Sequence, residues 1–240
     1  SNLWFSRNVA DKEHDMVQKL AITESNISKV TNQNISKMVG VTTFVSMHTS
    51  IDIEELNFFV ERLIDYDDSI IGNLGIFEDT TAIYLYPYED NKDMSNINLA
   101  EIPFQREDAL IVKNLLEVVI TPPVELVQGG MGIMTRMPIV LEDDTYWGQL
   151  GYMMRYEDIL EVLELDTNGY SYLITQYNEY DDSSHVVYDS GFEGDFLTDE
   201  VIVQLPSGYW RVQIGYDKIL GLKYPSFYIL IVTSFVLFGL

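Results

Sequence analysis

Apolar residues recur at intervals of three and four along the N-terminal part of the chain, from Val9 to His48. This segment has no proline and a single glycine, Gly40, so the pattern predicts one long helix. The seam is imperfect, because polar residues interrupt it: the apolar set is Met16, Leu20, Ile27, Val30, Val41, Phe44 and His48, and the interruptions are Thr23, Asn34 and Lys37. Such a helix pairs with a partner helix or packs on its own domain, and the pattern leaves both open.

A second amphipathic helix is predicted after residue 52. Asp52 and Glu55 form a plausible N-terminal cap for a helix that reaches about Asp67, with Leu56, Phe59, Val60, Leu63 and Ile64 facing inward. From Ile70 to Tyr88 the pattern alternates with period two, which is typical of strands. Residues 89–98 form a polar loop. Pro103 then begins a helix that runs through Leu116 and that the prolines after Thr121 must end.

Most of the remaining chain is predicted to be strand. The expected strands are Val124–Val127, Gly132–Leu141, Tyr146–Met154, Tyr170–Tyr177, His185–Tyr188, Val201–Leu205 and Tyr209–Ile214, with a short helix at Glu157–Leu163. This order predicts an α+β fold: a long N-terminal stalk helix followed by two tandem PAS-like antiparallel-sheet units. The expected divisions are residues 1–48 for the stalk, 49–155 for the first PAS-like unit, 156–222 for the second, and 224–240 for the start of a transmembrane helix.

The membrane assignment rests on the C-terminal residues. Tyr224–Leu240 has no charged residue, follows Lys218 and Lys223, and is close to the roughly 20 apolar residues that a spanning helix needs. The start at Ser1 without an initiator Met indicates a piece excised from a longer protein.

Charge and cysteine content narrow the function classes. The chain has 14 basic and 38 acidic residues, a net charge of -24, which makes nucleic acid a poor partner. Cysteine is absent, which excludes disulfides, thiolate nucleophiles and cysteine-bound zinc. His-Glu-x-x-His and Gly-x-Ser-x-Gly motifs are also missing. We therefore expect no cofactor, no metal and no catalytic activity in this portion.

The segment VELVQGGMGIMTRMPIVLEDDTYWG, Val124 to Gly148, closely resembles the bacterial CHASE domain pattern. The matching residues are Leu126, Gln128, Gly129, Gly130, Gly132, Arg136, Pro138, Tyr146, Trp147 and Gly148. Thr121-Pro122 resembles the family's lead into this segment, and Leu205–Ile214 resembles the strand that closes its membrane-proximal unit. The resemblance covers roughly Gly72 to Ile214.

The resemblance implies a small-ligand receptor at the cell membrane that faces the periplasm or the extracellular space and is flanked by two membrane helices. It places the ligand in the membrane-distal unit, residues 49–155, and makes residues 156–222 the membrane-proximal unit. From the stalk helix we expect a homodimer. Plant cytokinin receptors are related, and bacterial members commonly precede diguanylate cyclase (GGDEF), phosphodiesterase or histidine kinase domains. A GGDEF-type output is expected here. The alternatives are a structural or dimerisation ectodomain without a small ligand, a histidine kinase sensor, and a membrane-anchored hydrolase.

Arg136 is the leading candidate for ligand binding. It shares a strand face with Gly132, Met134 and Pro138, and a buried guanidinium must be paired by a bound anion or by a carboxylate of the chain. By its spacing from Gly132 and Pro138, Arg136 corresponds to the threonine that plant receptors use. The resemblance with this exchange implies a ligand with an acidic or strongly hydrogen-accepting group.

Six further residues are candidates for the pocket, and four of them have a structural alternative. Gln128 offers an amide to a ligand or caps a turn formed by the glycines that follow. Tyr84 and Tyr86 stack on a planar ligand or form the packed face of a sheet. Trp147 is core or pocket wall, and the set is completed by Thr121 and Met134.

Overall fold

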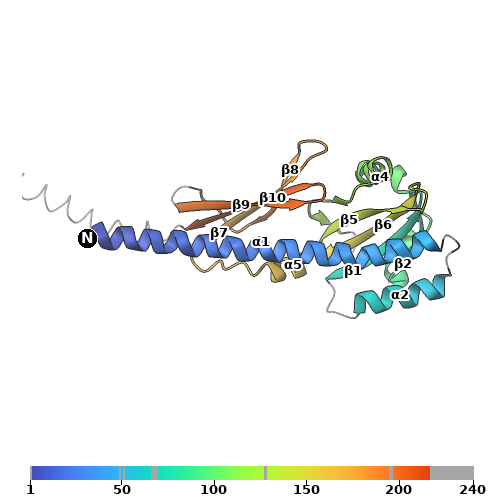
Figure 1. The fold of residues 1–240 in the computed structure, drawn as a ribbon, viewed down its shortest axis with the longest axis horizontal. Helices are drawn as coiled ribbons and strands as arrows, with labels where there is room; N and C mark the ends of the chain where they lie inside the picture. The colour runs from blue at the N-terminus through green and yellow to red at the C-terminus, as the bar shows by residue number, and fades with distance from the viewer. Residues whose placement is uncertain are drawn as a thin grey trace, which may run out of the picture.

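Two antiparallel sheets lie side by side along one long helix (Figure 1). The computed structural model describes residues 2–48, 50, 52–65, 70–126, 129–194 and 197–216. Both sheets follow the long helix in sequence, so the predicted α+β class with two tandem antiparallel units is confirmed.

Within the described residues, the first sheet has six strands and the second has four. The first sheet runs in the order β2-β1-β6-β5-β3, and β4 pairs with the start of β5. Its strands are β1 (Ile71–Glu78), β2 (Thr81–Tyr86), β3 (Val119–Ile120), β4 (Val124–Glu125), β5 (Met131–Val140) and β6 (Tyr146–Arg155). The second sheet runs in the order β8-β7-β10-β9, formed by β7 (Ser171–Asn178), β8 (Ser184–Asp189), β9 (Leu197–Leu205) and β10 (Gly208–Tyr216). The short helix α5 (Tyr156–Leu163) connects the two sheets.

Helix α1 (Asn2–Met47) packs its seam against both sheets of its own chain (Figure 1). The buried stripe includes polar residues that the sequence presented as interruptions: it comprises Met16, Leu20, Thr23, Ile27, Asn34, Met38, Val41 and Val45. Asn34 is accommodated because its side-chain amide donates to the Val30 carbonyl at 2.7 Å. The interrupted heptad pattern therefore results from the packing of α1 on two sheets.

Replacing Gly40 with alanine is expected to stabilise the protein. Gly40 lies inside α1, and an added Cβ would meet no atom closer than Leu63 Cδ1 at 4.0 Å. Alanine is favoured over glycine in a helix interior by roughly 1 kcal/mol. We expect the free energy of unfolding in urea to rise by about 0.5 to 1 kcal/mol, and an unchanged or lower value would contradict this.

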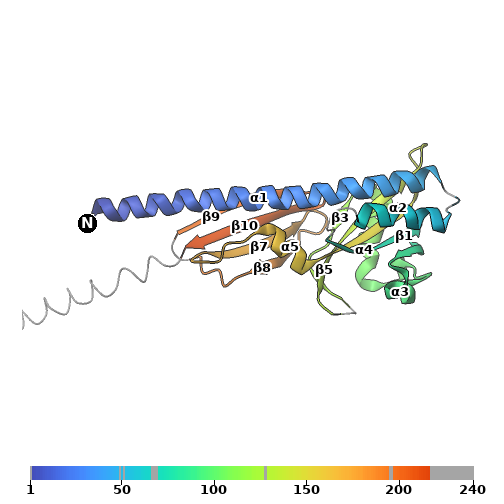
Figure 2. The same cartoon turned by 90° about the horizontal axis from the view of Figure 1, so that it is seen from below.

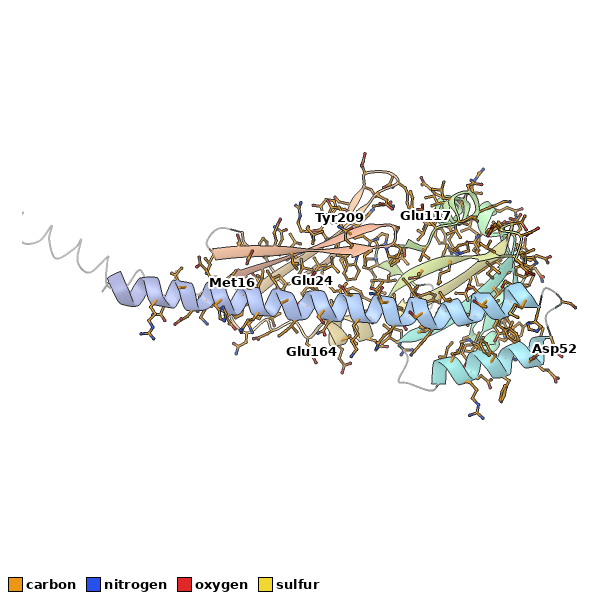
Figure 3. The ribbon with its side chains drawn as sticks, in the orientation of Figure 1. Met16, Glu24, Asp52, Glu117, Glu164 and Tyr209 are labelled. Carbon is orange, nitrogen blue, oxygen red and sulfur yellow. The ribbon has the colours of Figure 1, made fainter. Side chains whose placement is uncertain are left out.

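Helices cover both faces of the first sheet (Figure 2). Helix α1 and helix α2 (Ile53–Asp65) pack on one face, and helix α4 (Pro103–Leu115) packs on the other. The predicted cap of α2 is confirmed, because the Asp52 carboxylate accepts from the backbone N–H groups of Glu54 at 2.9 Å and Glu55 at 3.3 Å (Figure 3). Leu56, Val60 and Ile64 point into the core as predicted.

The segment between β2 and β5 differs from the predictions. The expected polar loop, residues 89–98, contains the helical turns α3 (Tyr88–Asn91) and η1 (Lys92–Met94), and a further turn, η2 (Leu99–Glu101), follows it. Helix α4 ends at Leu115, one residue earlier than predicted, because Leu116 adopts a left-handed conformation with φ 57°. The two-residue strand β3 that follows was not predicted, since a strand this short leaves no periodic pattern.

The N-terminal part of α1 is attached to the second sheet by aromatic and charged side chains. The Lys12 ammonium lies 4.9 Å from the ring centroid of Tyr216, the last residue of β10, and the Tyr170 hydroxyl donates to Asp15. Lys19 forms an ion pair with Asp166 at 2.7 Å. These contacts hold residues 12–19 of α1 beside the end of β10 and the residues that precede β7.

Several predictions fall on residues outside the described ranges, among them the end of the second helix near Asp67 and the last residue of the strand Val124–Val127. The proposed membrane span, residues 224–240, and Gln128 lie outside the described residues. Among the helices of the described ranges, none has the length and apolar character to cross a membrane.

Stability should decrease at alkaline pH through Tyr152. This side chain is buried in the core against α1 and α2, and burial raises the pKa of its hydroxyl to about 12, against about 10 in the unfolded chain. The folded state binds this proton more tightly, so the contribution is complete below pH 10 and disappears as the pH rises through 12. We expect Tyr152→Phe to remove on the order of 2 kcal/mol from the fall in unfolding free energy between pH 10 and pH 12, measured by urea denaturation. An identical pH profile in both proteins would contradict this.

Candidate ligand-binding site

Arg136 lies near the middle of β5, on the face of the first sheet that α4 covers. Its backbone neighbours are Val119 of β3 and Gly151 of β6. Only 1% of Arg136 is exposed. The absence of a side chain at Gly151 leaves room for the guanidinium, since a Cβ there would lie 3.3 Å from Nη1. The sequence thus places an arginine where a cation has almost no contact with water.

The guanidinium has no anionic partner among the described residues. Its Nη2 donates to Gln105 Oε1 at 2.7 Å, while Nε and Nη1 have no hydrogen-bond partner. Asp108, one helical turn after Gln105 on α4, is the carboxylate that acts on it electrostatically, without forming an ion pair. Burial lowers the pKa of Arg136 to about 10, and Asp108 opposes this shift. The side chain therefore stays charged at neutral pH, and two of its three nitrogens have no hydrogen-bond partner.

A second unsatisfied polar group lies on the same face, at Gln149 of β6. Gln149 is fully buried, and its Nε2 donates to the Tyr146 hydroxyl at 3.0 Å and to the Ala109 carbonyl of α4 at 3.4 Å. Its Oε1 has no partner within the described residues. Gln149 pairs with Pro138, two residues from Arg136, so the two side chains are diagonal neighbours on the sheet.

Burial also acts on the carboxyl and hydroxyl groups near Arg136. It raises the pKa of Asp108, and the adjacent Arg136 cation partly offsets that rise. It likewise raises the pKa of Tyr146, whose hydroxyl donates to the Asp79 carbonyl at 2.7 Å. Together these residues form a polar layer between α4 and the sheet, with unused donors at Arg136 and an unused acceptor at Gln149. That combination can bind a small group that carries both a negative charge and a hydrogen-bond donor.

The structure brings two other predicted residues close to Arg136. Thr121 follows β3, and its Oγ1 accepts from the Met134 backbone N–H at 3.0 Å while its own N–H donates to the Met134 carbonyl. Met134 lies two residues before Arg136 on the same face of β5. Both therefore lie at the border of the polar layer, next to the paired residues of β3 and β5.

Three predicted residues lie on the opposite face of the sheet. Tyr84 packs in the core with α1 and α2 and donates to Asn57 Oδ1 at 2.7 Å. Tyr86 and Trp147 pack against the same core. A ligand held by Arg136 does not reach these three side chains, because the sheet itself separates them.

Two cavities lie away from Arg136. One of about 990 Å³ lies between the ends of β1 and β2 and helix α5, and Tyr86 and Arg155 contribute to its wall. The other, of about 440 Å³, lies beside β2 and α2 and is lined in part by Tyr84. That Tyr84 and Tyr86 contact a ligand remains a prediction, and such a ligand would occupy one of these two cavities.

Four residues of the polar layer were not predicted: Gln105, Asp108, Tyr146 and Gln149. One signal was present in the sequence. Gln105, Ala109 and Val112 recur at helical spacing and form the buried face of α4, so a glutamine occupies an apolar stripe. For Gln149 no such signal exists, because its face depends on the pairing of β6.

No protein-family model and no curated protein matches the sequence. The fold is similar to an extracellular ligand binding receptor from Desulfohalobium retbaense, with a TM-score of 0.66 and 12% identity over 85% of this chain and 40% of that chain. It is also similar to the ligand binding domain of the Pseudomonas aeruginosa chemoreceptor PctB in complex with L-Arg (TM-score 0.62, 14% identity, 89% and 98% of the two chains). The sensor domain of the Vibrio cholerae histidine kinase DctB is a third such structure (TM-score 0.56, 9% identity, 88% and 99%). These likenesses show a shared fold.

Proposed function

We propose that this chain is the extracytoplasmic small-ligand sensor domain of a bacterial membrane receptor, with its ligand bound between α4 and the first sheet. The observation that carries the proposal is the buried Arg136 guanidinium, which has two nitrogens without a hydrogen-bond partner and no anionic partner among the described residues. An uncompensated buried cation costs several kcal/mol, so its retention favours an anion supplied from outside the protein. The shared fold with sensor domains named for ligand binding supports the same assignment.

The proposed ligand is a small molecule with an acidic group beside a hydrogen-bond donor. The acidic group would pair with Arg136, and the donor would face Gln149 Oε1 or Asp108. Amino acids and hydroxy acids satisfy both requirements. Because Arg136 is almost completely covered, α4 must move away from the sheet to admit the ligand.

We also propose the CHASE assignment, the four-part division of the chain and a membrane span at residues 224–240. The resemblance of Val124–Gly148 supports the first, and the uncharged C-terminal residues support the last. A GGDEF-type output remains the preferred proposal. A histidine kinase output is the alternative that the likeness to the DctB sensor domain favours.

Dimerisation through α1 is a further part of the proposal. The seam of α1 is occupied by the two sheets, so a partner would contact the remaining surface of the helix. Val17, Ile22 and Val39 are exposed there and offer apolar contacts. Sedimentation of a Val17→Glu variant against the parent protein tests this contact: the variant is expected to be monomeric at concentrations where the parent is dimeric.

A thermal-shift screen tests the sensor function. The panel comprises the L-amino acids, small hydroxy acids and dicarboxylates, and each acid is matched with its neutral methyl ester or amide. A ligand at 100 times its Kd stabilises the folded state by about 2.7 kcal/mol, a shift of roughly 5 °C or more for a chain of this size. We expect at least one acid to give such a shift, confirmed by calorimetry, while its neutral analogue gives none. If no acid stabilises the protein, or acid and ester act equally, the proposed site is wrong.

A further inference from the structure

Side chains of the second sheet bind the backbone of the first sheet at Ile120. The Ile120 N–H donates to Ser207 Oγ at 3.0 Å, and the Ile120 carbonyl accepts from Gln176 Nε2 at 2.8 Å. Ser207 lies in the turn between β9 and β10, and Gln176 lies on β7. The outer edge of β3 is thus completed by the neighbouring sheet instead of by another strand.

This contact continues into the centre of the second sheet. Gln176 Oε1 accepts from the indole N–H of Trp210 at 3.0 Å, and the two residues are paired between β7 and β10. Ile120, Gln176, Ser207 and Trp210 are all buried. A buried donor or acceptor that loses its partner costs about 1 to 3 kcal/mol, so the four groups favour moving together.

The other side of β3 contacts the proposed ligand site. Val119 pairs with Arg136 and Ile120 pairs with Thr135 of β5. Residues 116–118 alone separate β3 from α4, the helix that supplies Gln105 to the guanidinium. Strand β3 therefore lies between the Arg136 site and the second sheet and is bonded to both.

A second contact joins the same connection to the second sheet. Glu117, labelled in Figure 3, accepts a hydrogen bond from the hydroxyl of Tyr180. Tyr180 belongs to the turn between β7 and β8. Glu117, two residues after α4, and Ile120 of β3 are thus both bonded to side chains of the second sheet or of its turns.

We propose that Ile120, held by Gln176 and Ser207, is the point through which occupation of the Arg136 site alters the second sheet, and that the Gln176–Trp210 pair receives the change. This inference rests on the proposed function and extends it, because it assigns positioning roles to Gln176 and Ser207. From Trp210 the change extends along β10 to its last residue, Tyr216, whose ring contacts Lys12 of α1. A ligand shifts this arrangement only by its differential affinity for the two positions of α4.

The contact between Ile120 and the second sheet is tested by hydrogen exchange in the Ser207→Ala variant. The substitution removes the acceptor of the Ile120 N–H and leaves Gln176 and Trp210 in place. We expect exchange at the Ile120 amide to accelerate at least about 10-fold. The Thr121 amide, which donates to the Met134 carbonyl within the first sheet, is the internal control and should be unchanged. Equal exchange rates of the Ile120 amide in the parent protein and in Ser207→Ala would contradict this contact.

The coupling is tested with a substitution in place of a ligand. Arg136→Met perturbs the site, and the indole N–H of Trp210 reports the result in ¹⁵N–¹H spectra. We expect Arg136→Met to displace the Trp210 signal in the parent background, to displace it less than half as far in Ser207→Ala, and to leave it in place in Gln176→Met. The exposed Arg106 of α4 provides the control, since Arg106→Met should leave the signal unchanged.

The outcomes separate this inference from the proposed function. An unmoved Trp210 signal in Arg136→Met, or an equal displacement in all three backgrounds, overturns the coupling even where the thermal-shift screen has found a ligand. If Gln176→Met does not fold, the comparison of the parent with Ser207→Ala alone decides. A failed ligand screen accompanied by the expected signal changes would instead overturn the proposed function and leave the connection between the sheets intact.

Discussion

Arg136→Met is expected to remove most of the ligand-induced stabilisation while the ligand-free protein remains at least as stable as the parent. Truncating one partner of a buried charged pair costs 2 kcal/mol or more, so affinity for an acidic ligand should fall about 30-fold or further. In the ligand-free state the same change removes a buried cation whose Nε and Nη1 are unsatisfied and replaces it with an apolar side chain of similar length. Thermal unfolding with and without the acid identified by the screen measures both effects.

The control for this prediction is Arg106→Met, which removes the same charge from the exposed surface of α4. It should alter neither affinity nor stability by more than a few tenths of a kcal/mol. A large drop in the melting temperature of ligand-free Arg136→Met would contradict the prediction, because it would mean that the protein itself satisfies the guanidinium.

Gly148→Ala is expected to destabilise the protein more than any other substitution considered for the first sheet. Gly148 begins the regular part of β6 opposite Glu78, and an added Cβ would lie inside contact distance of the Phe77 carbonyl oxygen. Backbone atoms of a central strand pair cannot yield without breaking the ladder. We expect a loss of about 4 kcal/mol or more, or failure to fold, in urea denaturation.

Gly72→Ala in the same sheet is the matched control. Its Cβ would meet the Cε atom of Met153, the end of a flexible side chain that can rotate away. The cost should stay near 1 kcal/mol, within the usual range for a single substitution. Equal costs for the two alanine variants would show that the close backbone contact at Gly148 is relieved by movement of the strands.

The helices and strands were largely predictable because their patterns are local. The period of α1, the Asp52 cap and the alternation in β5 and β6 each depend on neighbours within a few residues. The buried position of Asn34 could also have been predicted from nearby residues, because an asparagine in a helix can donate a hydrogen bond to the carbonyl four residues earlier.

The composition of the site was not predictable, because it depends on strand faces that only the pairing fixes. A bulge between Ile139 and Val140 directs Tyr146 toward Gln149 and leaves Trp147 against the core on the other face. Simple alternation along β6 gives the opposite result for Trp147. Whether Tyr84 and Arg136 share a face depends on the registers of the two strands between them, β1 and β6. Those registers cannot be read from the sequence of any single strand.

The continuity of α1 has a consequence for how the two sheets act on each other. At about 1.5 Å per residue, its 46 residues form a rod roughly 70 Å long that contacts both sheets without a break. An unbroken helix is stiff along its axis, so a displacement imposed at one end arrives at the other nearly undiminished. Because α1 contacts β5 and β6 of the first sheet and β9 and β10 of the second, the two sheets are attached to a single stiff rod.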